Sequence, residues 1–234
     1  MTKTTRRPIW LVAVISLGAL SVVAVVALVA ARFTIFIPYR QPSGSMYPAI
    51  RPGDLLYANG LDKTPARGAV MVFHFPERRE QLFDKRVIGL PGDVVRTKGK
   101  AVLVNDWEIP RCVVGRHAYK DPTGEEHTGE LELELLGDTS YLIFHEDGAL
   151  AVDEAGPWHV GDGQYFVLGD NRNNSHDSRM WFGGVGGGVP LDDTVGRVRG
   201  LEQPELPPGA DALRAAFEGC LAKRPAQTTP PAPK

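Results

Sequence analysis

The sequence predicts a mainly β fold built from antiparallel strands, behind one apolar helix at the N-terminus. The chain of 234 residues is rich in glycine (26 residues) and proline (19 residues), which favours a turn-rich body over a helical bundle. After residue 32 the apolar segments are short, and turn residues separate them. Strands do not alternate with long helices, so a doubly wound nucleotide-binding fold is not expected.

The first predicted element is the apolar helix. Residues 8–31 contain no charged side chain and are dominated by Val, Ala, Leu and Ile. A helix of this length spans roughly 36 Å, enough for the hydrocarbon core of a bilayer. We therefore expect a transmembrane anchor that follows a cytoplasmic N-terminus, residues 1–7. A cleavable signal peptide ending near Val29-Ala30-Ala31 is the alternative, but the run is longer than the apolar region of a typical signal peptide.

The charges beside this helix leave its orientation open. The basic residues before it are Lys3, Arg6 and Arg7, and those that follow it are Arg32, Arg40 and Arg51. Because an excess of positive charge marks the cytoplasmic side, a near tie does not decide which side the body faces.

Strands are expected after the helix. Phe33–Tyr39 is alternating and apolar, which predicts a first strand leaving the membrane. Further runs of strand length lie between turn signals; they are Leu55–Ala58, Val70–Phe75, Arg86–Leu90, Val102–Val104, Leu131–Leu136, Tyr141–Phe144, Tyr165–Leu168 and Val195–Leu201. Beyond them, Ala210–Lys223 has helical character. The tail Pro225–Lys234 has too little apolar surface to fold and is predicted to be disordered.

Composition excludes several classes of function. The formal net charge of −2 argues against a nucleic-acid partner. The two cysteines, Cys112 and Cys220, are too few for a disulfide framework or a four-cysteine zinc site. No zinc-hydrolase spacing of histidines is present. We therefore expect neither a metal nor a cofactor.

The first segment with possible chemistry is PSGSMYP, residues 42–48. It can be read as a plain Ser/Gly/Pro turn, or as a nucleophile held on a strained turn. In the second reading Gly44 lets the backbone approach a substrate, and Ser45 attacks a carbonyl. The Ser45 amide and the Ser43 hydroxyl then face the developing oxyanion, while Met46 forms a soft pocket wall.

The second segment is KRVIGLPGD, residues 85–93. A lysine at this place is usually a strand-end charge that reaches solvent. If the Lys85 amine is buried instead, desolvation lowers its pKa, and the neutral amine can act as a general base toward a serine hydroxyl. Arg86 keeps its proton and cannot do this. We expect it to form an ion pair on the other face of the strand.

The third segment is GDNRNNSHDSR, residues 169–179. Its polar side chains suit either a surface loop or a rigid hydrogen-bonded network. In such a network Ser175 would orient the lysine amine, and Asp177 and Arg179 would brace the loop. His176 and Asp177 are sequence neighbours, so Asp177 is poorly placed to orient that ring, and we expect His176 to face solvent.

In this order behind an N-terminal anchor, the three segments resemble the hallmark boxes of bacterial type I signal peptidases, a family of membrane-bound Ser/Lys serine proteases. Arg67-Gly68 and Val70-Met71-Val72-Phe73 resemble a fourth box. The resemblance covers roughly residues 37–199. It implies that Ser45 is the nucleophile, Lys85 the general base, Ser43 an oxyanion-hole donor and Ser175 the residue that orients Lys85.

The resemblance also implies an architecture and a location. Residues 32–97 and 164–201 would form a catalytic β core, residues 98–163 an inserted second β domain, and residues 202–234 a short helix and tail. The N-terminus would lie inside and the body outside the cytoplasmic membrane. The expected partners are exported preproteins with small residues at positions −3 and −1, and membrane lipid, with the protein acting as a monomer. In that oxidising compartment Cys112 and Cys220 could pair, although Cys220 lies beyond the resemblance.

Several positions depart from the family pattern. Asp84 and Gln41 stand where aliphatic pocket residues are usual, and Ala69 replaces an Asp. Asp84 would raise the pKa of Lys85 if it came near the amine, but strand alternation could point it away. Together with Met46, the remaining candidates for the pocket lining are Pro42 and Phe83. The stretch Trp181–Pro190 is longer and richer in glycine than is usual in the family, which predicts a mobile loop near the site.

Two other functions remain open. One is a specialised processing peptidase for a single secretion or conjugation substrate, with which Asp84 and the glycine-rich loop are compatible. The other is an inactive membrane-anchored β scaffold, against which the presence of both Ser45 and Lys85 argues.

Overall fold

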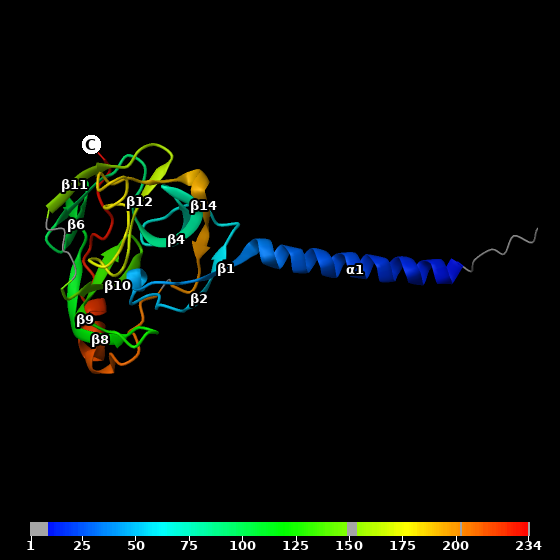
Figure 1. The fold of residues 1–234 in the computed structure, drawn as a ribbon, viewed down its shortest axis with the longest axis horizontal. Helices are drawn as coiled ribbons and strands as arrows, with labels where there is room; N and C mark the ends of the chain where they lie inside the picture. Colours follow the sequence, from blue (N-terminus) through cyan, green and yellow to red (C-terminus); the bar gives the residue numbers. More distant parts are fainter. Residues whose placement is uncertain (1–8, 149–153, 202, 234) are drawn as a thin grey trace, which may run out of the picture.

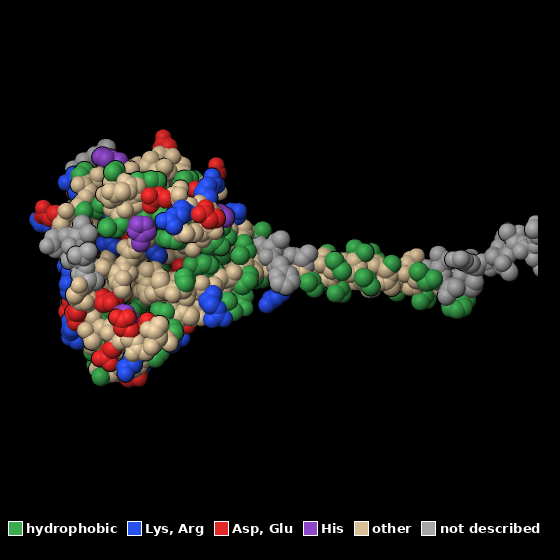
Figure 2. Space-filling model, in the orientation of Figure 1, with side chains coloured by type: hydrophobic (Ala, Val, Ile, Leu, Met, Phe, Trp, Pro, Cys, Tyr) green, Lys and Arg blue, Asp and Glu red, His purple; other side chains and the backbone are tan. Residues whose placement is uncertain are grey.

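The computed structural model describes residues 9–148, 154–201 and 203–233, and within the N-terminal helix it describes side chains at positions 10, 13–29, 32 and 35. That helix, α1 (Ile9–Ile35), projects away from a β body (Figure 1). Figure 2 shows hydrophobic side chains along its surface, and described examples such as Leu17 and Leu20 are more than half exposed. No helix among the described residues is both long and apolar enough to cross a membrane.

The helix continues further than the sequence predicts. A strand was expected from Phe33, whereas α1 ends at Ile35 and β1 (Phe36–Arg40) begins one residue later. Extending an existing helix by a few residues is favourable once it has nucleated. The strand begins where pairing becomes available, since Phe36 is the first residue in register with a partner, Asn59.

The body is mainly β, as predicted, and every ladder between its named strands is antiparallel. The largest sheet has seven strands in the order β1-β2-β14-β3-β4-β12-β13. Besides β1 these are β2 (Leu55–Asn59), β3 (Val70–Phe75), β4 (Arg78–Gly89), β12 (Gln164–Leu168), β13 (Val189–Pro190) and β14 (Thr194–Val198).

Two smaller sheets come from the middle of the chain. One has the order β10-β9-β8, and the other β11-β5-β6-β7. Their strands are β5 (Val94–Lys98), β6 (Ala101–Val104), β7 (Trp107–Glu108), β8 (Arg111–Lys120), β9 (Glu126–Leu136), β10 (Thr139–Glu146) and β11 (Glu154–His159). By pairing, β5 belongs with β6 and β11, although it precedes the expected boundary at residue 98.

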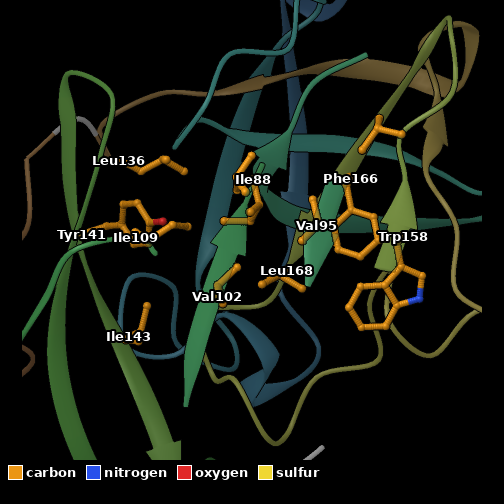
Figure 3. Close-up of a cluster of buried hydrophobic side chains, with 12 residues drawn as sticks. Ile88, Val95, Val102, Ile109, Leu136, Tyr141, Ile143, Trp158, Phe166 and Leu168 are labelled. Carbon is orange, nitrogen blue, oxygen red and sulfur yellow. The ribbon is translucent and has the colours of Figure 1, made fainter. Parts of the chain in front are cut away.

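The sheets share a hydrophobic core. One buried cluster joins Ile88, Phe166 and Leu168 of the seven-stranded sheet to residues of both smaller sheets (Figure 3), including Val95 and Tyr141. Because the cluster crosses between sheets, the smaller sheets hold strands β4 and β12 in place from one side. These two strands lead into the polar segments of interest.

Four short helices complete the described fold: η1 (Gly44–Met46), η2 (Leu191–Asp193), η3 (Asp211–Leu213) and α2 (Arg214–Ala222). The helix α2 confirms the helical character predicted for this region. It packs on β8 and β9, and a disulfide joins its Cys220 to Cys112 of β8. The pairing that the sequence left open is therefore present.

The tail differs from the predicted disorder. Its described residues lie along the body, where the Gly137 amide donates to the Thr228 carbonyl at 2.7 Å and Asn105 Nδ2 donates to the Pro231 carbonyl at 2.7 Å. The prolines restrict the free chain and so reduce the entropy lost on ordering it. Hydrogen bonds to the body and the burial of Pro230 hold this segment.

Candidate active site

The candidate nucleophile lies on the turn η1, directly after β1. Ser43 caps this turn, and Met46 is fully buried in a cluster with Ile50 and Val70. The backbone of Ser45 is fixed from the other side, because its carbonyl accepts a hydrogen bond from the Asn171 amide at 3.1 Å. The burial of Met46 and the hydrogen bond from the loop after β12 therefore fix the position of Ser45.

Lys85 lies on β4, an inner strand of the seven-stranded sheet, and is 3% exposed. Its Nζ is 2.8 Å from Ser45 Oγ and 2.8 Å from the Asp84 carbonyl oxygen, to which it donates. Burial lowers the pKa of Lys85, and this effect outweighs the charge of Asp84, which acts in the opposite direction. The amine is therefore easier to deprotonate than an exposed lysine and contacts a serine hydroxyl directly.

Two potential donors lie close to Ser45 Oγ. The Ser43 hydroxyl donates to it at 3.2 Å, and the Ser45 amide approaches Ser43 Oγ at 3.5 Å. A carbonyl oxygen that becomes negative beside Ser45 Oγ would meet a hydroxyl and a backbone amide, which is the chemistry of an oxyanion hole.

Arg86 points to the other face of β4, as the period of a strand requires, and forms the predicted ion pair. Its Nε and Nη2 donate to the two oxygens of Asp170 at 2.7 and 2.6 Å, and its Nη1 donates to the Gly68 carbonyl at 2.5 Å. Arg86 is 1% exposed and Asp170 is fully buried. This bidentate pair joins β4 to the loop after β12.

The polar loop, residues 169–179, forms a hydrogen-bonded network. Asp177 accepts from the Gly169 amide at 3.0 Å and from Arg179 Nε at 2.8 Å, and Arg179 Nη2 donates to the Arg172 carbonyl at 2.5 Å. Burial alone would raise the pKa of Asp177, but the Arg179 guanidinium and these hydrogen bonds lower it. The carboxylate is therefore held ionised inside the loop.

Ser175 lies near the nucleophile but does not hydrogen-bond to the lysine. Lys85 hydrogen-bonds to Ser45 and Asp84, and no hydrogen bond among the described residues joins it to Ser175. The Ser175 hydroxyl is shielded from solvent and makes no hydrogen bond to the described residues, although it lies near enough to Asp177 to help lower the pKa of that carboxyl. A Cβ at Gly169 would lie 2.2 Å from Ser175 Oγ and 2.5 Å from the Ser45 carbonyl oxygen, so only glycine allows this close approach.

A pocket of about 260 Å³ opens beside Ser45 and Lys85. Pro42 and Phe83 line it, as the sequence suggested, but Met46 does not, because its side chain points into the core. The full lining is Tyr39, Gln41, Pro42, Ser43, Gly44, Ser45, Leu82, Phe83, Asp84, Lys85, Asn174 and His176. His176 is at the rim, with its side chain 54% exposed, as expected for a solvent-facing residue.

Asp84 and Gln41, the two departures from the family pattern, are partners in this pocket. Both are 1% exposed, and Gln41 Nε2 donates to Asp84 Oδ2 at 2.8 Å. No ion pair within 4.0 Å joins Asp84 to Lys85 in the described structure. Burial raises the pKa of Asp84, against the opposing charge of Lys85.

Sequence reasoning missed a second buried ion pair behind the loop. Arg172 Nη1 donates to Glu134 Oε1 at 2.6 Å, and both residues are buried. Glu134 lies on β9, so the pair joins the polar loop to one of the smaller sheets. The density of polar residues around Arg172 indicated such a network. The sequence near Arg172 did not identify Glu134 as its partner.

Within the part of the chain that the structure describes, one group of side chains could ligate a cation. The ligand atoms of Asp121, Glu125 and His127 lie within 4.8 Å of one another at the tip of the β8–β9 hairpin. Glu125 is exposed, and His127 Nδ1 already interacts with Glu146 at 2.8 Å. Since exposed acidic groups are common without an ion, we assign no metal role to them.

Comparison with known proteins shows similarity to signal peptidases. A family model described as "Signal peptidase, peptidase S26" matches residues 14–201. Proteins named signal peptidase I are similar to the chain: that of Pseudomonas aeruginosa is 37% identical and that of Pseudomonas fluorescens 38% identical, each over 160 residues that cover 62% of this chain. That of Rickettsia prowazekii is 30% identical over 210 residues, which cover 78% of this chain and 77% of the relative.

The extent of these matches differs. The chain spans about half the length of the two Pseudomonas relatives, 55% in each case. A solved signal peptidase I from Enterococcus faecalis covers 58% of this chain at 25% identity with a TM-score of 0.33, which is too low to support an argument about the fold.

Proposed function

The chain belongs to the signal peptidase family, peptidase S26, and from that premise we propose that it is a serine endopeptidase that removes N-terminal signal peptides from exported preproteins. The observation that carries the proposal is the 2.8 Å contact between Lys85 Nζ and Ser45 Oγ, made by an amine that is 3% exposed.

In the proposed reaction Ser45 attacks the scissile carbonyl while Lys85 takes its proton. The neutral amine offers a lone pair at hydrogen-bond distance, and burial favours that neutral form. The Ser45 amide and the Ser43 hydroxyl stabilise the oxyanion. Lys85 then protonates the leaving amine and afterwards activates a water molecule that releases the acyl enzyme. None of these steps uses a metal or a cofactor.

We assign supporting roles to the polar loop. Asp177 and Arg179 brace it through their mutual hydrogen bonds, which keeps the Ser45 carbonyl against Asn171. Ser175 would orient Lys85 after a small rearrangement, and its unpartnered hydroxyl is compatible with this role. Pro42 and Phe83 line the pocket that receives the substrate.

We further propose a single-pass anchor, residues 8–31, in the cytoplasmic membrane, with residues 1–7 inside and the body on the extracytoplasmic side. The exposed apolar side chains of α1 and the disulfide, which persists in an oxidising compartment, support this placement. The β body would consist of a catalytic core, residues 32–97 and 164–201, an inserted unit, residues 98–163, and the C-terminal segment, residues 202–234. The protein would act as a monomer on preproteins at the lipid surface, without nucleic acid.

The test is cleavage of preproteins by the full chain in detergent. Ser45→Ala and Lys85→Ala should each reduce kcat/KM by at least about a thousandfold while the circular dichroism spectrum is retained. Lys85→Arg should be equally inactive, because a guanidinium does not give up its proton. Asp162→Asn, at an exposed turn, is the matched control and should cleave normally. Robust cleavage by either alanine variant would overturn the mechanism.

A specialised processing peptidase is the second candidate function, and the buried polar pair Gln41–Asp84 favours it. Several unrelated preproteins should then differ widely in cleavage rate, whereas a general signal peptidase cleaves them at similar rates. An inactive scaffold would cleave none of them.

A further inference from the structure

The pocket beside Ser45 contains a buried carboxyl that the proposed reaction does not use. Asp84 and its partner Gln41 are each 1% exposed, yet both line the cavity that Ser45 and Lys85 share. Neither side chain takes part in the proton transfers. The presence of this buried polar pair in the pocket therefore needs an explanation other than catalysis.

A polar pair at this position is unfavourable for stability alone. Burying a carboxyl costs free energy unless donors satisfy it, and alkyl side chains of similar size would avoid that cost. Gln41 Nε2 supplies one donor, at 2.8 Å. The Tyr39 hydroxyl, which donates to the Leu82 carbonyl at 3.3 Å, and the backbone amide of Asp84 also interact with the carboxyl. A carboxylate has about four acceptor sites, so a ligand in the pocket could bring a further donor to it.

The other lining residues define which ligand side chains fit. Pro42, Leu82 and Phe83 give the pocket apolar walls, and its volume is about 260 Å³. Gln41 uses its amide nitrogen on Asp84, so the pair presents mainly oxygen acceptors. Lys85 gains a proton during the proposed reaction, and a cationic side chain in the same pocket would repel that charge. The combination fits a small, neutral side chain with a hydroxyl donor.

We propose that Asp84 and Gln41 select a substrate residue whose side chain donates a hydrogen bond, serine above all, over alanine at the position that enters this pocket. The inference rests on the proposed function, because it concerns the substrate of that same site. An alanine methyl offers Asp84 no hydrogen bond, whereas a serine hydroxyl can donate one.

The experiment compares matched preprotein peptides with the full chain in detergent. The peptides differ only at position −1 or only at position −3, where they carry Ser, Ala or Val, and kcat/KM is measured for each. For the wild-type chain we expect Ser to exceed Ala by roughly tenfold at one of the two positions, since the unmatched carboxyl penalises the alanine peptide.

Variants then connect this preference to the polar pair. In the double variant Asp84→Leu with Gln41→Leu the ratio of Ser to Ala should fall to one or below, and Val should be accepted better. Asp84→Asn keeps a carbonyl acceptor and should keep a ratio above one. In Gln41→Leu alone, Asp84 loses the hydrogen bond from Gln41, so the ratio of Ser to Ala should rise. This single variant replaces the double variant as the test if the double variant does not fold. Asp162→Asn, an exposed carboxyl, should match the wild type.

The ratio of kcat/KM for the Ser peptide to kcat/KM for the Ala peptide measures substrate selection separately from catalysis. Both peptides react with the same Ser45 and Lys85 in each variant, so a change in the pKa of Lys85 alters both rates together and cancels. If the wild-type chain cleaves the Ala peptide as well as the Ser peptide at both positions, or if the ratio survives in the double variant, the inference is overturned. If the folded wild-type chain cleaves no peptide, the proposed function itself fails and the inference fails with it.

Discussion

At the residue scale, three consecutive side chains of β4 enter three different environments. Lys85 is buried against Ser45, Arg86 is paired with Asp170 on the opposite face, and Asp84 bonds to Gln41 in the pocket. The lysine is the costly member, because no carboxylate forms an ion pair with it among the described residues and burial disfavours its charge. We propose that the chain tolerates this cost because it produces a neutral amine beside a hydroxyl.

The cost of Lys85 predicts a pH-dependent stability. Its pKa is lower in the folded chain than in the unfolded chain, so between the two values the unfolded chain binds more protons and stability rises with pH. Lys85→Met removes this dependence. From pH 6 to pH 10 the wild-type free energy of unfolding should rise relative to that of Lys85→Met, by about 1.4 kcal/mol for each pH unit spent between the two pKa values.

Chemical denaturation of both proteins at each pH measures this difference. Titrating groups that do not interact with Lys85 are common to the two proteins and cancel in the comparison. The pKa of Asp84 depends on the Lys85 charge, so Asp84→Asn is introduced into both proteins. Parallel pH profiles for wild type and Lys85→Met would mean that the lysine is not desolvated in solution.

At the scale of elements, the site depends on strands that are far apart in the chain. β1 leads into the turn that carries Ser45, β4 carries Lys85, and the loop after β12 holds the Ser45 carbonyl through Asn171. One of the smaller sheets supports this loop through the buried pair of Arg172 with Glu134 of β9. The β8–β9 hairpin reaches the same turn, where Tyr119 stacks on Tyr47 with ring centroids 3.6 Å apart.

The contribution of the disulfide between β8 and α2 to stability can be tested directly by mutation. It closes a loop of sequence separation 108, and such a crosslink restricts the unfolded chain. Replacing both cysteines by serine should lower the free energy of unfolding by about 2–4 kcal/mol.

Urea denaturation of the Cys112→Ser, Cys220→Ser variant measures the loss. Dithiothreitol added to the wild-type chain should lower its urea midpoint to that of the variant and leave the variant unchanged. An identical midpoint for variant and oxidised wild type would show that the crosslink adds no stability.

At the scale of the whole molecule, the described chain forms a β body and one projecting helix, α1 (Figure 1). The body has a core that runs between its sheets, whereas the described side chains of α1 between positions 13 and 29 are all exposed. An apolar surface of this kind needs an apolar surrounding. The proposed membrane anchor provides one.

Leu20→Lys tests the anchor, because it places a charge near the middle of the apolar run. Insertion of a lysine at the centre of a membrane helix is unfavourable by about 2.5–3.5 kcal/mol. The wild-type chain and the control Leu20→Ile should stay in the membrane pellet after alkaline carbonate extraction, while Leu20→Lys should be largely released. Release of the wild-type chain would contradict the anchor.

The sequence by itself determined the class of fold and the candidate chemistry. Strand-length apolar runs predicted the β body, and each of them lies within or overlaps an observed strand. Strands such as β3, β10 and β12 are buried on both faces, and this burial requires continuous apolar runs that the local sequence displays. The same local patterns missed β5, β7, β8, β11 and β13. In β8, polar residues are interspersed, and the register with β9 shifts between Val113 and Gly115.

Tertiary structure alone decided which distant groups meet. It brought Lys85 to Ser45 and Asp84 to Gln41, left Ser175 without a hydrogen bond to Lys85, and removed Met46 from the pocket. It also paired the two cysteines and laid the C-terminal tail on the body. Contacts between residues dozens of positions apart depend on strand register and on the packing of one sheet against another, and no local pattern of residues encodes these.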